Sequence, residues 1–175
     1  GAFSSPGFSL VIAKNTGTIV DLQVVPIKTW QIGLAYALSA LTRGMVTLLI
    51  AFAATAWFIP GLHILHPFFL IGVLLVNGLM YGLLGVTFGM YAKAFEALTF
   101  MTTFILQPMI FLAGVFYPIS QLPAPWNFIS LFNPIHHTIN LIRYGFLGYH
   151  DVPISTSIAV NIAFVVILFI TSAWA

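Results

Sequence analysis

The sequence predicts an all-α integral membrane protein, and two observations carry that prediction. Hydrophobic residues make up 61% of the 175 residues and charged residues only 5%, so a soluble fold of this length would lack the polar side chains needed to cover its surface. Four apolar stretches also reach the roughly 20 residues that a helix needs to cross a bilayer. They predict transmembrane helices at residues 30–58, 68–92, 98–117 and 154–175, all within one transmembrane domain.

The composition also excludes several classes of function. The five lysines and arginines and the three acidic residues are scattered singly, whereas binding to nucleic acid needs clustered positive charge. The chain contains no cysteine, so disulfides, thiolate metal sites and thiol catalysis are excluded. No Gly-x-x-x-x-Gly-Lys-Ser/Thr phosphate loop is present. We therefore expect no nucleic-acid partner, no catalytic residue and no metal or cofactor on this chain.

Residues 1–29 are expected to form a cytoplasmic segment ahead of the first span. Leu10 and its apolar neighbours precede a turn at Asn15 to Gly17. Thr18 can then N-cap a short helix that Pro26 ends, with apolar residues on one face. Such a helix could dock into a cytoplasmic partner or lie in the membrane interface, and the spacing favours neither.

The first predicted span contains Arg43, the one charge inside a predicted span. A charged side chain at the bilayer centre costs about 2.5–3.5 kcal/mol, whereas each large apolar residue returns about 0.3–0.6 kcal/mol. The helix therefore still inserts. We favour an arginine that snorkels to headgroups or faces the bundle, and keep Arg43 as a candidate for contact with a transported substrate.

The second predicted span carries two pairs of glycines spaced four residues apart, Gly78 with Gly82 and Gly85 with Gly89. Small residues at this spacing let two helix backbones approach closely in a membrane. We expect them to pack helices within one bundle rather than to form a dedicated dimer seam.

The third predicted span contains Pro108, which should kink it because proline removes a backbone donor and clashes with the preceding turn. Phe104, Met109 and Phe111 on this span are candidates for the transport path. Packing within the bundle is the favoured interpretation of these three side chains.

Residues 118–153 are too many for a simple turn and too apolar for a solvated loop. They predict two short helices that re-enter the outer leaflet, with breaks at Pro123-Ala-Pro125 and at Asn133-Pro134. Re-entrant backbone is tolerated only where protein or a water-filled cavity surrounds it. This external region should therefore pack on the bundle near its outer mouth.

The basic residues predict the orientation of the chain. Lys14, Lys28 and Lys93 fall on one side of the four spans and Arg143 on the other, and cytoplasmic loops carry the excess of lysine and arginine. Residues 1–29 are therefore placed in the cytoplasm and residues 118–153 outside. We expect a multi-pass plasma-membrane protein, in the inner membrane if the source is bacterial.

Two separated stretches of the sequence resemble the permease subunits of type-2 ABC exporters, which move polysaccharides, lipids or drugs outward. The first stretch looks like the coupling helix of that family and comprises Gly17, Thr18, Asp21, Leu22 and Pro26. The second is similar to its external re-entrant region and is the more specific; it comprises Gly114, Phe116, Tyr117, Pro118, Leu122, Pro123, Trp126, Asn133, Pro134 and Arg143.

The resemblance implies six spans in all, two of them before Gly1, with the last one cut at Ala175. It also implies a dimer with a second permease copy or homologue, in contact with membrane lipid, and two separate ABC ATPase subunits that bind ATP and Mg. Gly17 to Pro26 would contact the ATPase, and Gly114 to Arg143 would help to close the outer mouth. Many family members carry an acid- and arginine-rich run before the coupling helix, whereas here only Lys14 is charged.

Two other classes of function stay open. An intramembrane metal-dependent enzyme would have to use the external histidines, and His63 and His66 could share a helical face, but no nearby carboxylate completes a site with those two. The side chains available to it are His63, His66, His136, His137, His150 and Asp151. An ion-coupled carrier usually keeps carboxylates at membrane depth, whereas Asp21, Glu96 and Asp151 all fall outside the predicted spans.

Overall fold

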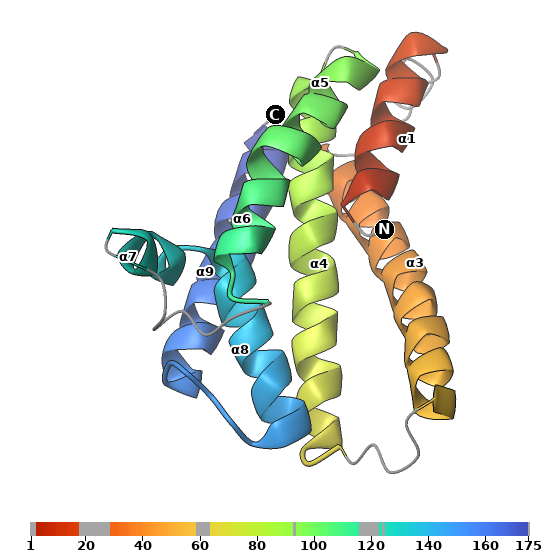
Figure 1. The fold of residues 1–175 in the computed structure, drawn as a ribbon. Coiled ribbons are helices and arrows are strands. Elements are labelled where there is room, and N and C mark those ends of the chain that lie inside the picture. Colours follow the sequence, from red (N-terminus) through yellow and green to blue (C-terminus); the bar gives the residue numbers. More distant parts are fainter. Residues whose placement is uncertain are drawn as a thin grey trace.

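The computed structural model describes residues 3–17, 29–58, 64–92, 94–115, 123 and 125–174. Within these residues every regular element is a helix (Figure 1). The helices are α1 (Ser4–Asn15), α3 (Thr29–Phe58), α4 (Pro67–Tyr91), α5 (Phe95–Met101), the π-helix η1 (Thr102–Leu106), α6 (Gln107–Leu112), α7 (Trp126–Leu131), α8 (Pro134–Leu147) and α9 (Ile154–Trp174).

Four helical segments of the described chain are long and apolar enough to cross a membrane, so the predicted all-α membrane fold is confirmed. They are Trp30–Phe58, Pro67–Tyr91, Phe95–Leu112 and Ile154–Trp174. The third begins three residues before the predicted start and ends at Leu112. Gly114 follows that end in the left-handed region, at φ 78°, a conformation that suits glycine after a helix C-terminus.

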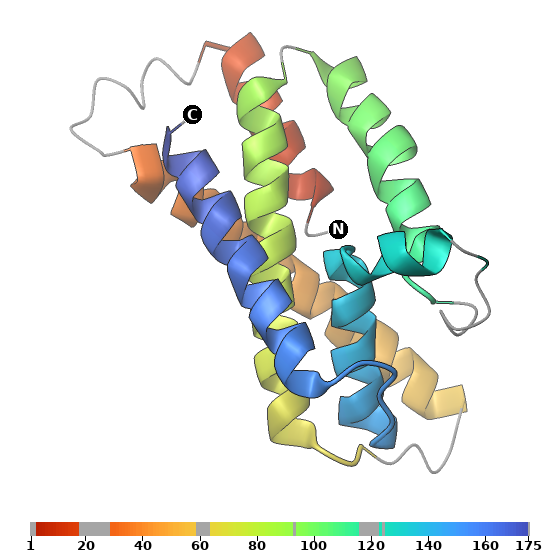
Figure 2. The same ribbon diagram turned by 90° about the vertical axis from the view of Figure 1, so that its left-hand side faces the viewer.

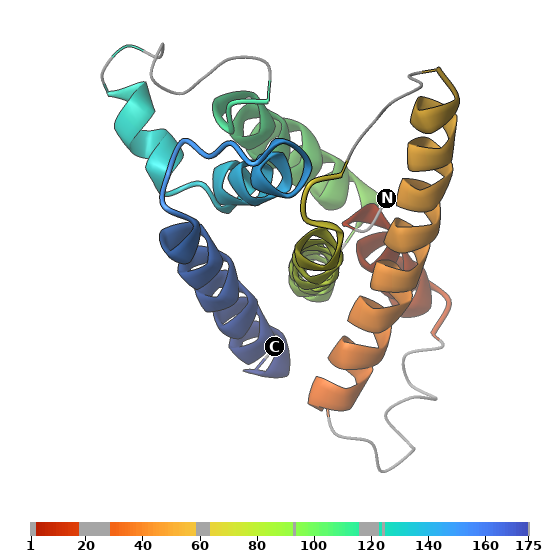
Figure 3. The same ribbon diagram turned by 90° about the horizontal axis from the view of Figure 1, so that it is seen from below.

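Helix α4 is the central element of the bundle. Buried residues make up 44% of its apolar window but 11% of each of the other three spans. It packs against α1, α3, α8 and α9, and Figures 1 and 3 show it between α3 and α9. The fold therefore depends on how closely these neighbours approach α4.

The glycines of α4 allow that close approach. A Cβ atom on Gly82 would lie 2.9 Å from the carbonyl oxygen of Ala37 in α3, and one on Gly89 would lie 2.9 Å from the Cα atom of Gly7 in α1. A Cβ atom on Gly85 would overlap the Phe3 carbonyl at 2.1 Å. As predicted, these glycines pack helices together within the bundle.

Helix α1 was not predicted. Its twelve residues fall well short of the length that identifies a transmembrane span, yet it packs along α4 with Leu10 and Val11 buried. The Lys14 ammonium group at its end donates hydrogen bonds to the carbonyl oxygens of Gly89, Met90 and Ala92, at 3.1, 2.5 and 3.2 Å. Those carbonyls close α4, so a positive charge there is favourable to the helix dipole.

The third span is irregular one turn before Pro108. The Gln107 backbone N–H donates to Thr102, five residues back, which defines the wider π turn of η1. A π turn relieves the crowding that proline causes in an α-helix. The described structure has the π-helix η1 just before Pro108, and the kink expected at Pro108 stays a prediction.

The described part of the predicted external region forms two short helices, α7 and α8, with a break at Asn133-Pro134 as predicted. Asn133 caps α8 by accepting a hydrogen bond from the Ile135 N–H at 3.0 Å, and Pro134 occupies the first helical position. Figures 1 and 2 show that α8 starts near the end of α6 and runs to the far end of the bundle.

Candidate functional site

Side chains of α8 and its N-cap satisfy the end of the third span. The Asn133 side-chain amide donates to the Met109 carbonyl at 2.6 Å, the His136 Nδ1–H to the Ala113 carbonyl at 3.2 Å, and the Arg143 guanidinium to the Gly114 carbonyl at 2.5 Å. The last carbonyls of a helix have no partner within it, and inside a membrane each unpaired group costs several kcal/mol. These bonds therefore allow the third span to end inside the bundle.

The same contacts assign the His136 tautomer. A carbonyl oxygen only accepts, so the Nδ1 atom of His136 must carry the proton. The Nε2 atom is then a bare acceptor, buried and without a partner in the described part of the chain.

Arg143 also organises the C-terminal end of α8. Its guanidinium forms an ion pair with Asp151 at 3.0 Å, and the Tyr149 hydroxyl donates to the other carboxylate oxygen of Asp151 at 2.6 Å. The Asp151 N–H donates in turn to the Asn140 side chain at 2.7 Å. The hydrogen bond to Asp151 and the charge of that carboxylate raise the pKa of Tyr149. The loop between α8 and α9 is thereby fixed to the end of the third span.

A polar network lies deeper in the bundle, between α4, α8 and α9. Its centre is the Thr138 hydroxyl, which hydrogen-bonds to the Asn77 side chain and lies 3.1 Å from the Asn161 carbonyl oxygen. The Tyr81 hydroxyl also hydrogen-bonds to the Thr138 side chain. Thr138, Asn77 and Asn161 are all at least 95% buried. The network ties α8 to two membrane-spanning helices.

A second set of polar contacts joins α8 to the start of α9. The His137 Nε2–H donates to the Leu131 carbonyl at 2.8 Å, which leaves Nδ1 to accept from the Ser157 hydroxyl at 3.0 Å. The Asn140 amide donates to the same Ser157 oxygen at 2.9 Å and to the Val152 carbonyl at 2.8 Å. Both α8 side chains are thus satisfied by neighbouring elements.

The remaining described histidines lie near Tyr144. The His66 ring stacks on the Tyr144 ring at a centroid distance of 4.9 Å, and the His150 ring lies 6.0 Å from it. His63 lies outside the described residues. In the described ranges no three His, Cys, Asp or Glu side chains are grouped so that they could hold a metal ion.

The structure brings together part of the predicted external region. Gly114 and Arg143 are in direct contact, Asn133 and Pro134 start α8, and the Trp126 N–H donates to the Pro123 carbonyl at 2.9 Å. Phe116, Tyr117, Pro118 and Leu122 lie outside the described residues. Of the predicted coupling residues, Gly17 follows α1 at φ 76°, and Thr18, Asp21, Leu22 and Pro26 lie outside the described residues.

The four candidate transport-path residues do not form one cluster. Phe104 and Phe111 are 65% and 55% exposed on the third span, whereas Met109 packs against the buried cluster around Leu106. Arg43 lies on α3 and donates to the Ser5 hydroxyl of α1 at 2.7 Å. Their place in a transport path stays a prediction.

Sequence reasoning missed the polar network. Thr138, Asn140, Ser157 and Asn161 were not among the predicted site residues, although Ser157 and Asn161 stand one helical turn apart in the predicted span 154–175. That spacing was the available signal, because polar side chains inside a membrane span face protein or water.

Comparisons with known proteins agree with these observations. The model of the family described as ABC-2 type transporter matches residues 1–147. The chain is 32% identical over 170 residues to the inner membrane transport permease YadH of Escherichia coli K12, an alignment that covers 97% of this chain and 66% of YadH. It therefore spans slightly less than two thirds of that relative.

More distant similarity extends to nodulation proteins. The chain is 31% identical over 110 residues to nodulation protein J of Rhizobium leguminosarum biovar viciae, covering 63% of this chain and 42% of that protein. For nodulation protein J of Rhizobium meliloti the identity is 28% over 120 residues, 69% of this chain and 45% of that protein. No solved structure matches. The resemblance inferred from the sequence is confirmed: the chain is a multi-pass inner membrane protein and belongs to the ABC-2 type transporter family.

Proposed function

We propose that this chain is the membrane-spanning subunit of an ATP-driven ABC exporter, which moves a lipid-like, polysaccharide or drug substrate outward. The observation that carries the proposal is the family match over residues 1–147, which includes all the described helices up to α8. The relative YadH is itself named an inner membrane transport permease.

The energy for transport would come from a separate ATPase subunit. The sequence holds no phosphate loop of its own, so ATP and Mg would bind to that partner on the cytoplasmic side. Residues 17–26 are the proposed contact with it. They connect α1 to α3, and both helices pack against α4. A displacement of residues 17–26 would therefore reach the centre of the bundle through two helices.

The outer side would be closed by α8 together with the end of the third span. Bonds from Asn133, His136 and Arg143 hold these two segments together, and Thr138 holds α8 to α4 and α9. In a dimer of permease subunits, movement of this region would alternately open and close a cavity between the two halves.

Crosslinking tests the proposed coupling. A cysteine placed at Asp21 in the full-length protein is expected to crosslink to the ATPase subunit with a yield that changes between nucleotide-free and ATP-bound states. A cysteine at Phe58, at the opposite end of α3, is the matched control and should not crosslink. Absence of a crosslink from position 21 under every nucleotide condition would contradict the proposal.

A further inference from the structure

We propose that the contact between α8 and the end of the third span is acid-sensitive, because a proton bound at the Nε2 atom of His136 releases it. His136 donates from Nδ1 to the Ala113 carbonyl at 3.2 Å, and its side chain is only 2% exposed. The contact lies within this chain, so the inference does not depend on the proposed transport. The ring is already enclosed by this chain, and further spans or a second copy would bury it more deeply.

The added proton has one place to bind on this ring. Nδ1 already carries a hydrogen, which the Ala113 carbonyl accepts, so a second proton adds to Nε2. The Nε2 atom is buried and has no hydrogen-bond partner in the described part of the chain. Protonation would therefore create a buried, charged donor without an acceptor, which is an unfavourable arrangement inside a protein.

The charged groups close to His136 do not compensate for that proton. On α8 itself, His137 and Arg143 lower the pKa of His136 in the same direction as burial, which is the largest cause. Asp151, in the loop before α9, acts in the opposite direction, as does the hydrogen bond to the Ala113 carbonyl. The Asp151 carboxylate is already paired with the Arg143 guanidinium at 3.0 Å. The balance favours the neutral ring.

The other elements that pack against α8 bring no charge to the ring. From α4 comes Tyr81, whose hydroxyl hydrogen-bonds to the Thr138 side chain. His66 and His150 lie against Tyr144, about two turns further along α8. The helices α6, α7 and α9 contain no titratable side chain. Within the described residues, a protonated His136 would thus lack a free carboxylate.

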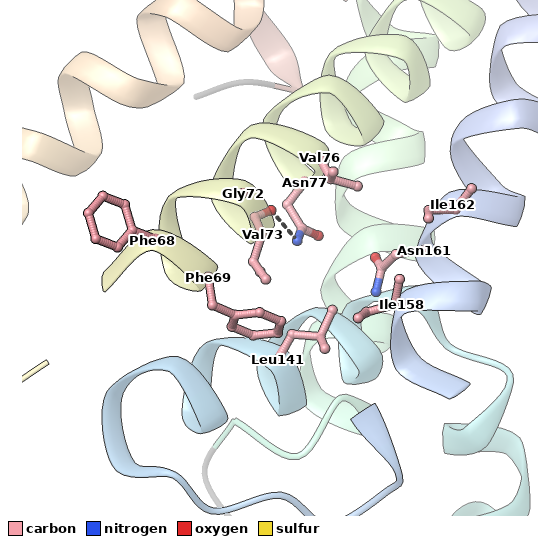
Figure 4. A pocket seen from close by; sticks show the side chains of 10 residues that line it. All are labelled: Phe68, Phe69, Gly72, Val73, Val76, Asn77, Leu141, Ile158, Asn161 and Ile162. Carbon is pink, nitrogen blue, oxygen red and sulfur yellow. Dashed lines mark hydrogen bonds between the residues drawn. The ribbon is translucent and has the colours of Figure 1, made fainter. Parts of the chain in front are cut away.

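Two cavities that α8 helps to line do not extend to this ring. The cavity drawn in Figure 4 receives only Leu141 from α8, between side chains of α4 and α9. The other lies between α3, α4 and α8 and receives Thr138 and Ile142. His136 lines neither of them, so neither cavity offers the Nε2 atom a hydrogen-bonding group.

His137 provides an internal contrast. It is also 2% exposed, but its Nε2–H donates to the Leu131 carbonyl and its Nδ1 accepts from the Ser157 hydroxyl. A proton on Nδ1 of His137 could be donated to the Ser157 oxygen, because a hydroxyl can change from donor to acceptor. The acid sensitivity is therefore expected from His136 and not from its neighbour.

The expected pH dependence has a defined sign. Because the folded pKa of His136 lies below the ordinary histidine value of 6.5, the unfolded chain binds more protons than the folded one between these two values. Stability is therefore complete above pH 6.5 and falls as the pH drops toward the folded pKa. For one such proton the unfolding equilibrium constant rises by up to about tenfold per pH unit.

Reversible unfolding of the full-length protein by SDS, measured between about pH 5 and pH 8, tests the proton uptake. His136→Asn keeps an amide donor for the Ala113 carbonyl but cannot be protonated, so it should flatten the pH dependence. His150→Asn is the matched control, because His150 is exposed, and it should keep the wild-type pH dependence. A merely structural role of His136 would instead change the unfolding constant by the same factor at every pH.

A second measurement follows the contact itself. Ala113 is 0% exposed and the chain has no cysteine of its own, so the thiol of Ala113→Cys reports opening at the end of the third span. When the pH falls from about 7.5 to about 5.5, its reaction with a thiol reagent should gain at least about threefold over the same variant carrying His136→Asn. Comparing the two backgrounds at one pH cancels the titration of the thiol.

Two results would overturn the proposal. The first is the same pH dependence of unfolding in wild type and His136→Asn, which would show that His136 takes up no extra proton when the chain unfolds. This measurement decides the proposal even where Ala113→Cys fails to fold. The second is a reaction rate of Ala113→Cys with the same pH dependence in both backgrounds, which would show that protonation does not release the contact.

Discussion

Removing the Thr138 hydroxyl tests whether the polar network holds α8 in the bundle. In Thr138→Val the shape is nearly kept, but Asn77 and Asn161 lose the donor between them. Both asparagines are at least 95% buried, and leaving a buried acceptor unpaired costs about 1–3 kcal/mol. Hydrogen bonds between helices in membranes average ~0.6 kcal/mol and reach ~1.7 kcal/mol. We therefore expect the free energy of unfolding to fall by about 0.6–1.7 kcal/mol.

The assay is reversible unfolding of the full-length protein by SDS in mixed micelles, followed by tryptophan fluorescence. Thr87→Val is the matched control, because the Thr87 hydroxyl donates only to the Leu83 carbonyl of its own helix, at 2.9 Å, and such back-bonding adds little to stability. The variants are expected to differ by about 0.6–1.7 kcal/mol in the free energy of unfolding. Equal unfolding free energies for Thr138→Val and Thr87→Val would refute the reasoning.

Three further predictions concern the outer end and the α1–α4 contact. Asp151 raises the pKa of the Tyr149 hydroxyl. The hydrogen bond between these two side chains therefore contributes fully to stability below the ordinary pKa of tyrosine, and this contribution is lost as pH rises through the higher pKa of the folded state. The ultraviolet titration difference between wild type and Tyr149→Phe should show a midpoint above 10, and Asp151→Asn should return that midpoint toward 10. Gly85→Ala, whose Cβ atom would overlap the α1 backbone, should lower the free energy of unfolding by about 1–3 kcal/mol in the SDS assay, whereas Gly72→Ala should leave it within ~0.5 kcal/mol. A lysine at position 143 cannot hold Asp151 and the Gly114 carbonyl in the same fork geometry, so Arg143→Lys should lower the free energy of unfolding by about 1 kcal/mol in the SDS assay. An unchanged titration midpoint would contradict the contact of Tyr149 with Asp151. An unchanged free energy of unfolding in Gly85→Ala or in Arg143→Lys would contradict the contact made by that residue.

The spans were predictable because hydrocarbon imposes a simple length and composition rule. The first span was predicted at residues 30–58 and is found at Thr29–Phe58, and the last was predicted from residue 154, where α9 begins. The break at Asn133-Pro134 was also predictable, because proline acts through the local backbone. Local sequence therefore sufficed where the constraint was local.

The rest depends on tertiary contacts that no local pattern encodes. Helix α1 is too short for the span criterion and is held by burial against α4. Thr138 meets Asn77 only because α8 folds back against α4, 61 residues away along the chain. The family resemblance placed Gly114 and Arg143 in the same region, but only the fold shows that the Arg143 guanidinium donates a hydrogen bond to the Gly114 carbonyl.

The chain is expected to cross the bilayer repeatedly, with the proposed coupling segment, residues 17–26, and the predicted re-entrant region, residues 118–153, on opposite sides. Labelling with a membrane-impermeant thiol reagent tests it most directly, because the chain has no cysteine of its own. A cysteine at Asp21 should react only from the cytoplasmic side and a cysteine at Trp126, which is 47% exposed, only from the outside. Reaction of both positions from the same side would contradict the account.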